Sequence, residues 1–188
     1  MSTTTETTTL PGYVAGTWTI DPVHSEVGFS VRHMMVSKVR GRFTTFSGDI
    51  VTGESPLDSS VTATIDLSSI DTGNPDRDNH IRSADFFEVD RHKTMNFRST
   101  GLRQDGEDYV LDGELTLKAV TKPLSLRLEP GGFGQDPYGG TRAGFTAIGQ
   151  LKRSDFGVDF NAVLETGGVV VGDKVDLLLE IEAVLNES

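Results

Sequence analysis

The residues with the most potential for chemistry are four histidines and one dense polar segment. The segment reads RDNHIR over residues 77–82, and its two arginines and one histidine can offer several hydrogen-bond donors to a diphosphate or a quinone oxygen. Asp78 is placed to orient one of these donors. An equally good interpretation is a capped surface helix in which acidic and basic side chains pair in solvent. The sequence leaves both interpretations open.

The histidines do not form a local metal-binding motif. They are His24, His33, His80 and His92. None has the HExxH spacing or another close pairing, and the chain lacks cysteine. We therefore predict no metal site and no cofactor.

Nucleophilic catalysis is not indicated either. Ser25 follows His24 directly, but adjacent residues on a strand point to opposite faces, so the hydroxyl and the imidazole are badly placed to meet. The chain has no GxSxG turn and no phosphate-binding loop, and no acid and base come together in the sequence. We predict no catalytic residues and no enzymatic activity.

His33 ends a segment with the pattern of a strand. Val27, Phe29, Val31 and His33 occupy every second position and therefore share one face. An apolar row that ends in a histidine suits a pocket wall with a polar rim, and it also suits an ordinary sheet whose last residue reaches water. Similar alternation recurs over residues 43–51, 61–67, 94–98, 109–118, 124–129, 143–151 and 175–183.

About eight long strands with one apolar face predict an all-β fold, either an antiparallel barrel or a sandwich. We favour the barrel because closure removes exposed edges and because a barrel of this size can hold one small ligand. Small residues at inward positions would leave space inside, which favours an elongated apolar cavity. They are Gly113, Ala143, Ala147, Gly149 and Ala183.

Large apolar side chains would line that interior. The candidates are Phe29, Val31, Phe43, Phe46, Ile65, Phe86, Phe87, Met95, Phe97, Leu115, Phe145 and Leu179. For any one of them, packing into a filled core is the alternative. An open interior could hold a long isoprenoid tail without charged anchors, since burial contributes roughly 0.8 kcal/mol per CH₂.

Two segments interrupt the strand pattern. Residues 70–92 are expected to hold a short helix capped by Asp76 or Asp78. Residues 153–172 are expected to form a turn, a short irregular or helical piece and a loop.

Composition limits the class of protein. Residues 13–188 suit one globular domain, preceded by a polar, threonine-rich tail over residues 1–12. The net charge of -11 argues against binding to nucleic acid. No run approaches the roughly 18 apolar residues of a transmembrane segment, and the first residues lack the features of a secretory signal. We expect a soluble, cytoplasmic protein, with a mature exported chain as the alternative.

Short motifs follow one another along almost the whole chain. They are WTIDPVHS from Trp18, FSVRH from Phe29, GRF from Gly41, IDT from Ile70, RDNHIRSADFF from Arg77, FRS from Phe97, GELTL from Gly113, TKP from Thr121 and RSDFG from Arg153. In this order, over about residues 16–185, the chain resembles the YceI-like family of polyisoprenoid-binding proteins.

The resemblance implies a lipocalin-like, extended β-barrel with one or two short helices and an elongated hydrophobic pore. It implies a polyprenyl ligand, such as an isoprenoid quinone or a polyprenyl diphosphate, and a homodimer. By position, the candidates for polar contacts at the mouth of the pore are His33, Arg77, Asp78, His80 and Arg82. Many relatives are exported to the periplasm, whereas no signal is visible in this sequence.

Three hypotheses follow for the function. The first is a non-enzymatic protein that binds, stores or transports a long isoprenoid or a similar amphipathic lipid. The second is a hydrolase or isomerase that acts on a lipid-like substrate, with His33 or His80 as the base and a carboxylate partner in the pocket. The third is a structural or interaction module with a packed barrel and an apolar outer patch.

Overall fold

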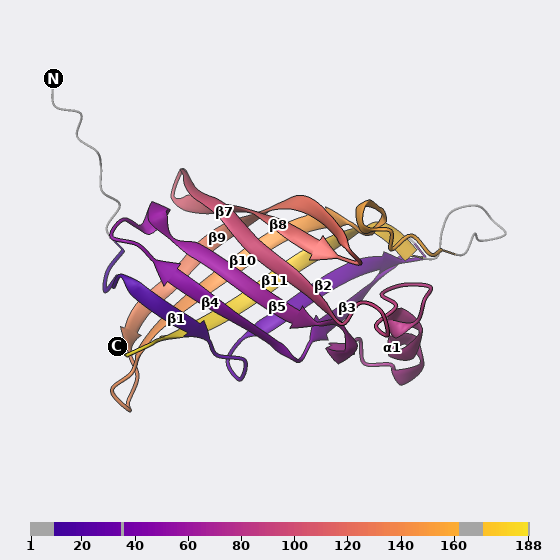
Figure 1. Cartoon of the computed structure of the whole chain (residues 1–188), viewed down its shortest axis with the longest axis horizontal. Helices are drawn as coiled ribbons and strands as arrows, with labels where there is room; N and C mark the ends of the chain where they lie inside the picture. Colours follow the sequence, from indigo (N-terminus) through magenta and orange to yellow (C-terminus); the bar gives the residue numbers. More distant parts are fainter. Residues whose placement is uncertain (1–9, 35, 162–170, 188) are drawn as a thin grey trace, which may run out of the picture.

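The computed structural model describes residues 10–34, 36–161 and 171–187. Within these residues the structure is mostly β, with one α-helix and three short 3-10 helices (Figure 1). The strands are β1 (Gly16–Ile20), β2 (Glu26–His33), β3 (Ser37–Phe43), β4 (Phe46–Thr52), β5 (Ser60–Asp66), β6 (Ile70–Asp71), β7 (Thr94–Asp105), β8 (Asp108–Leu117), β9 (Val120–Gln135), β10 (Thr141–Lys152) and β11 (Val171–Leu185). The helices are α1 (Pro75–Arg82), η1 (Pro56–Asp58), η2 (Leu67–Ser69) and η3 (Arg153–Phe156).

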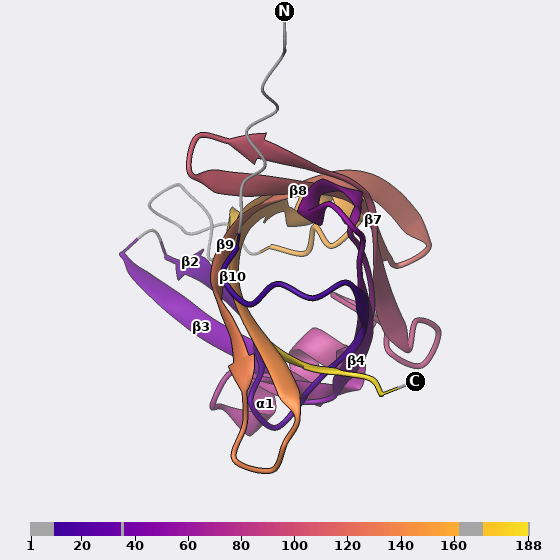
Figure 2. The same ribbon diagram turned by 90° about the vertical axis from the view of Figure 1, so that its left-hand side faces the viewer.

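The strands close into an antiparallel barrel, as predicted. The order around it is β1, β4, β5, β7, β8, β9, β10 and β11, and β11 pairs again with β1. Figure 2 shows this ring of strands seen from one end. The segment 43–51 is not one strand, because β3 ends at Phe43 and β4 begins at Phe46 after two threonines.

Two strands pair with the long strand β11 along the same edge. Its last part pairs with β1, through Trp18 opposite Leu185, whereas its first part pairs with β2. Ser25 lies at the change of partner, where its Oγ accepts from the N–H of Glu182 at 3.0 Å and donates to the C=O of Glu182 at 3.2 Å. β1 and β2 therefore follow one another along the same edge of β11, and β2 leads through β3 to β6 near α1.

One end of the barrel is obstructed by the chain that precedes β1, seen crossing the ring in Figure 2. The Tyr13 ring packs edge-on against Phe133 of β9 at 5.5 Å, while its hydroxyl donates to the C=O of Gly53 at 2.6 Å. Thr52 Oγ1 accepts from Trp18 Nε1 at 2.8 Å and donates to the C=O of Val14 at 2.8 Å. The tail predicted over residues 1–12 lies mostly outside the described residues, and the part from residue 10 packs on the barrel.

Of the five small inward residues, Ala147 lines the cavity, whereas the other four do not leave space in the way we predicted. A Cβ at Gly113 would overlap the ring of Phe97, and one at Gly149 would overlap the side chain of Leu126. Ala143 and Ala183 pack in the cluster around Trp18, near the obstructed end. These positions are small because neighbouring side chains fill the room that a larger residue would need.

The short helix lies where the sequence placed it, but its cap was assigned wrongly. Asn74 is the N-cap of α1, and its side chain accepts from the N–H of Arg77 at 3.1 Å. Asp78 is buried inside the first turns. In the second interruption η3 ends at Phe156, and the φ of 72° at its C-cap residue Gly157 suits glycine. The part of the predicted loop over 162–170 lies outside the described residues. None of the helices among the described residues is long and apolar enough to cross a membrane.

Candidate ligand-binding cavity

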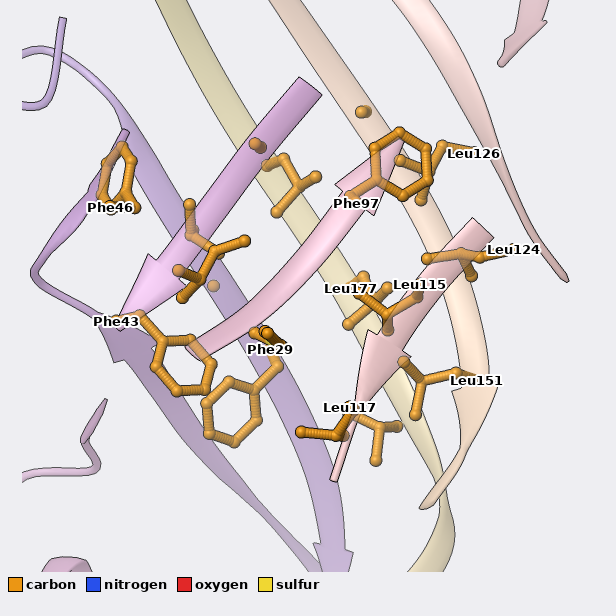
Figure 3. A pocket seen from close by; sticks show the side chains of 18 of the residues that line it. Phe29, Phe43, Phe46, Phe97, Leu115, Leu117, Leu124, Leu126, Leu151 and Leu177 are labelled. Atoms are coloured by element: carbon orange, nitrogen blue, oxygen red, sulfur yellow. The ribbon is translucent and has the colours of Figure 1, made fainter. Parts of the chain in front are cut away.

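A cavity of about 470 Å³ runs through the barrel. All of the apolar residues proposed from the sequence line it, as do Leu111, Leu117, Leu124, Leu126, Leu151 and Leu177, which the sequence analysis did not single out. Figure 3 shows several of these side chains pointing into the same space, among them Phe29, Phe43 and Leu117. Leu177 of β11 lies beside Phe29, its pairing partner on β2. The strands therefore surround a hollow and do not meet in a solid core. The missed leucines follow the same period-2 pattern, which was the signal available for them.

The inward face of β2 and β3 is the aromatic part of the wall. The ring centroids of Phe29 and Phe43 lie 5.6 Å apart, and those of Phe43 and Phe87 lie 6.1 Å apart. Val31 and His33 continue the row along β2 and also line the cavity. The predicted alternation on this strand is confirmed, and it brings His33 to the end of the cavity near α1.

Polar side chains gather at the end of the cavity next to α1. Arg77 lines this end, and Thr72 holds it in place: Arg77 Nε donates to Thr72 Oγ1 at 2.7 Å, and Nη2 donates to the C=O of Thr72 at 2.7 Å. Asp78 Oδ1 in turn accepts from the N–H of Thr72 at 2.9 Å and from its hydroxyl. Arg77 Nη1 makes no hydrogen bond to any described residue.

His80 lies at the same end, in a cluster with two aromatic rings that also contact each other at 5.3 Å. Its ring centroid is 5.1 Å from that of Phe86 and 5.1 Å from that of Phe160. Its Nε2 is 2.8 Å from Asp85 Oδ2, and both side chains are about half exposed. This pair is the histidine and carboxylate arrangement that the enzyme hypothesis requires, although it sits at the edge of the cavity and not deep inside it.

Two of the proposed polar contacts do not line the cavity. Asp78 is 7% exposed and is occupied by Thr72, so its part is to orient Arg77 through that threonine. Arg82 donates from Nε to the C=O of Ser68 at 2.8 Å and from Nη2 to the C=O of Ile70 at 3.0 Å. Arg82 therefore fastens α1 to the chain before it. Direct contact of these two residues with a ligand is not supported by their positions.

Arg153 is a buried cation at this end that the sequence analysis did not propose as a site residue. It is 7% exposed and lines the cavity. Its guanidinium donates to the C=O groups of Val158, Phe160, Val171 and Gly172 at 2.9 to 3.1 Å, and burial lowers its pKa. It adds positive charge at this end of the cavity. Its hydrogen bonds also join residues 158–160 to the start of β11.

A second polar cluster lies outside the cavity. The ligand atoms of Asp21, His24 and Glu182 are within 4.8 Å of one another, a geometry that could hold a cation. Arg142 Nη1 already lies 3.0 Å from Asp21 Oδ2 and 2.9 Å from Glu182 Oε2. Hydrogen bonds from His24 and Arg142 lower the pKa of Asp21 to about 2. The guanidinium neutralises this cluster, which holds the start of β2 against β11.

The fold and the cavity define a class of protein: a lipocalin-like antiparallel β-barrel with an internal apolar cavity. The model of the YceI-like domain matches residues 18–183, and the chain belongs to this family. Protein YceI of Escherichia coli is 38% identical over 86% of this chain and 82% of its own length. A protein of Photorhabdus laumondii is 40% identical over 86% of this chain and 81% of its own length.

Solved structures agree with the fold. The YCEI protein of Campylobacter jejuni has a TM-score of 0.70 and 31% identity, covering 89% of this chain and 96% of its own. BcnA of Burkholderia cenocepacia has a TM-score of 0.73 and 22% identity, covering 87% of this chain and 98% of its own. A polyisoprenoid binding domain of Saccharophagus degradans has a TM-score of 0.69 and 16% identity, covering 92% and 100%. At these last two identities the likeness concerns the fold alone.

Proposed function

We propose that this protein binds a long-chain isoprenoid, or a similar amphipathic lipid, in the barrel cavity, and that it stores or transports this lipid without transforming it. The observation that carries the proposal is the division of the cavity. Mostly apolar side chains surround its length, with the hydroxyl residues Ser47, Thr52 and Ser59 among them. The arginine and histidine side chains of Arg77, His80, His33 and Arg153 lie at the end near α1. A molecule with a long hydrocarbon tail and one polar head matches this division.

The energetics favour such a ligand. Each CH₂ moved from water into the cavity contributes roughly 0.8 kcal/mol, so a tail of about twenty carbons contributes roughly 16 kcal/mol, against an association cost of about 4–15 kcal/mol. The polar end then acts on the head group, because few but well-placed polar groups give a site its specificity. Family membership supports the ligand class, and so does the fold shared with the polyisoprenoid binding domain of Saccharophagus degradans.

In this proposal Arg77 donates a hydrogen bond to the head group through Nη1, the nitrogen that does not bond to Thr72. An anionic head such as a diphosphate would gain a charge-assisted hydrogen bond there, with His80 and His33 as further partners. A quinone oxygen would accept the same donor. The lipid is the ligand itself, and the proposal includes no cofactor.

Native mass spectrometry of the purified protein tests the proposal. We expect a fraction of the protein to carry an additional mass, and organic extraction should release a lipid with an isoprenoid fragmentation pattern. Protein stripped of lipid and mixed with an isoprenoid diphosphate or with a quinone should regain the mass of the added compound. Protein that neither carries a lipid nor takes up either compound would contradict the proposal.

The second candidate is an enzyme with His80 as its base. The observation in its favour is the 2.8 Å contact between His80 Nε2 and Asp85 Oδ2 at the edge of the cavity. Incubating the protein with the extracted lipid and following its mass and retention time distinguishes the two candidates. Turnover that is lost in His80→Gln would establish the enzyme, and recovery of unchanged lipid supports the binding protein.

A further inference from the structure

Four cations form a row across the outside of the barrel at the end where the cavity has its polar groups. Lys152 of β10 lies opposite Lys174 of β11, and Arg32 of β2 lies opposite Lys38 of β3. Arg32 also borders the start of β11, since a Cβ at Gly172 would lie 3.4 Å from Arg32 Cβ. β10, β11, β2 and β3 are consecutive in the sheet, so the row is continuous. We call these four residues the mouth band.

The side chains of the mouth band point away from the cavity. Leu151, Val175, Val31 and Val39 line the cavity and alternate with the four cations along their strands, and all four cations are exposed. Arg32 additionally contributes atoms to the cavity edge. The band therefore surrounds part of the mouth from outside.

The mouth band is unfavourable for the isolated protein. Like charges directly opposite on neighbouring strands are destabilising, and the band contains two such pairs. Among the described residues, none of the four forms an ion pair. The closest acids on β11 are hydrogen-bonded to other residues: Asp173 accepts from Ser154, and Asp176 accepts from Gln150. Asp173 also attracts Lys152 electrostatically, but it forms no direct ion pair with Lys152. In contrast, Arg98, Arg103 and Arg127 along the barrel each pair with an acid.

Apolar side chains stand exposed beside the mouth band. The turn between β2 and β3 carries Met34 and Val36, whose exposed fractions are 44% and 83%. Both residues come shortly after His33 in the chain, and His33 lines the cavity. Phe160, near His80, is 38% exposed at the same end. Exposed apolar residues next to a row of cations are the pattern of a surface that meets the boundary of a lipid bilayer.

We propose that the mouth band, together with the exposed side chains of Met34 and Val36, docks this end of the barrel on a bilayer that contains anionic lipids. The cations bind the head groups and these two apolar side chains enter the interface, so that the cavity mouth opens onto the membrane. The whole chain has a net charge of -11, so the part outside the mouth band is more acidic still. That part is repelled from the same surface, and this repulsion sets the orientation. The reason for docking rests on the proposed function, because a lipid carrier must take its ligand from a membrane.

Flotation with vesicles tests the docking. We use pure phosphatidylcholine vesicles and vesicles with about one third phosphatidylglycerol, at low and at high salt. The protein should float with the anionic vesicles at low salt only, because screening removes the attraction. Each cation near the surface changes the partition about fivefold, so the double variant Lys38→Gln with Lys174→Gln should bind more than tenfold more weakly.

The matched control removes the same charge elsewhere. The double variant Arg103→Gln with Arg127→Gln alters two exposed cations that already pair with acids, and it should float like the unchanged protein. Equal losses in both double variants, or no flotation of the unchanged protein with anionic vesicles, would overturn the proposal. Circular dichroism and thermal unfolding establish that each variant is folded.

The same samples separate this proposal from the proposed function. The Lys38→Gln with Lys174→Gln variant should keep its co-purified lipid, because these side chains lie outside the cavity. Flotation by a protein that carries no lipid would refute the lipid cargo and support the docking surface. Lipid uptake from detergent solution without flotation would refute the docking surface and support the cargo.

Discussion

The ring of Phe97 on β7 occupies the place that a side chain at Gly113 on β8 would need. The two strands are neighbours, and Phe97 lies opposite Leu115. Since Phe97 also lines the cavity, a larger residue at position 113 must push an aromatic ring into the space that the ligand would use.

The first prediction follows from this contact. Gly113→Ala should lower the free energy of unfolding by about 1–3 kcal/mol, the usual cost of overpacking. It should also reduce the amount of bound lipid. Gly134→Ala on β9 is the control, because a Cβ there meets nothing within 4 Å, and it should change stability little. Denaturant unfolding measures both, and equal effects would contradict the assignment.

The second prediction uses two adjacent residues of β10 that face opposite ways. Ala147 lines the cavity, whereas Ile148 is 50% exposed on the outside. Ala147→Phe should fill part of the cavity and reduce co-purified lipid at least tenfold, while Ile148→Phe should retain it. Quantitative extraction from equal amounts of folded protein gives the comparison. Full lipid content in Ala147→Phe would show that the ligand binds elsewhere.

The third prediction concerns the contact that orients Arg77. Thr72→Val removes the hydroxyl between Asp78 and Arg77 and should cost about 1–3 kcal/mol of stability, since it leaves the buried carboxylate short of a donor. Affinity for an isoprenoid diphosphate should fall more than affinity for the uncharged isoprenoid alcohol. Thr72→Ser keeps the hydroxyl and should retain the preference. Equal losses for both lipids would exclude this role for Arg77.

The fourth prediction is a pH dependence. The pKa of Asp21 is lowered from 3.8 to about 2 in the folded protein by His24 and Arg142. A lowered pKa stabilises the fold above the ordinary value, so this contribution is complete above about pH 4 and is lost as the pH falls toward 2. Arg142→Gln should reduce stability at neutral pH and make the loss between pH 4 and 2 shallower.

Arg91→Gln is the control for that experiment, because Arg91 forms an exposed ion pair with Glu88. Its unfolding curve against pH should follow that of the unchanged protein. Chemical unfolding at a series of pH values provides the data. An unchanged slope in Arg142→Gln would mean that Arg142 lowers neither the pKa of Asp21 nor that of Asp136, another carboxylate bonded to it.

The alternation of apolar residues was sufficient to predict the barrel and its lining. Every second residue from Val27 to His33 lies on the inner face, and the proposed apolar residues do line the cavity. Periodicity identifies the face on which a residue lies, because successive side chains of a strand point to opposite faces. This alternation does not depend on which strand is the neighbour.

The polar end was predicted less completely, because its contacts join residues from separate elements. The sequence did not show that Asn74 would cap α1, that Thr72 would separate Asp78 from Arg77, or that Arg82 would face backbone carbonyls. Arg153 was quoted as part of a motif without a role. Pairing of β11 with both β1 and β2 depends on register, which local patterns do not fix. The homodimer and the cellular compartment stay predictions.

The chain around Tyr13 crosses one end of the barrel (Figure 2) and leaves the end near α1 as the route for the proposed cargo. On that proposal a lipid would go in tail first and leave head first, so storage and release would share this route. A hydrocarbon chain longer than the barrel would have to fold back on itself or leave its remaining carbons outside. The depth of the barrel would therefore select for chain length.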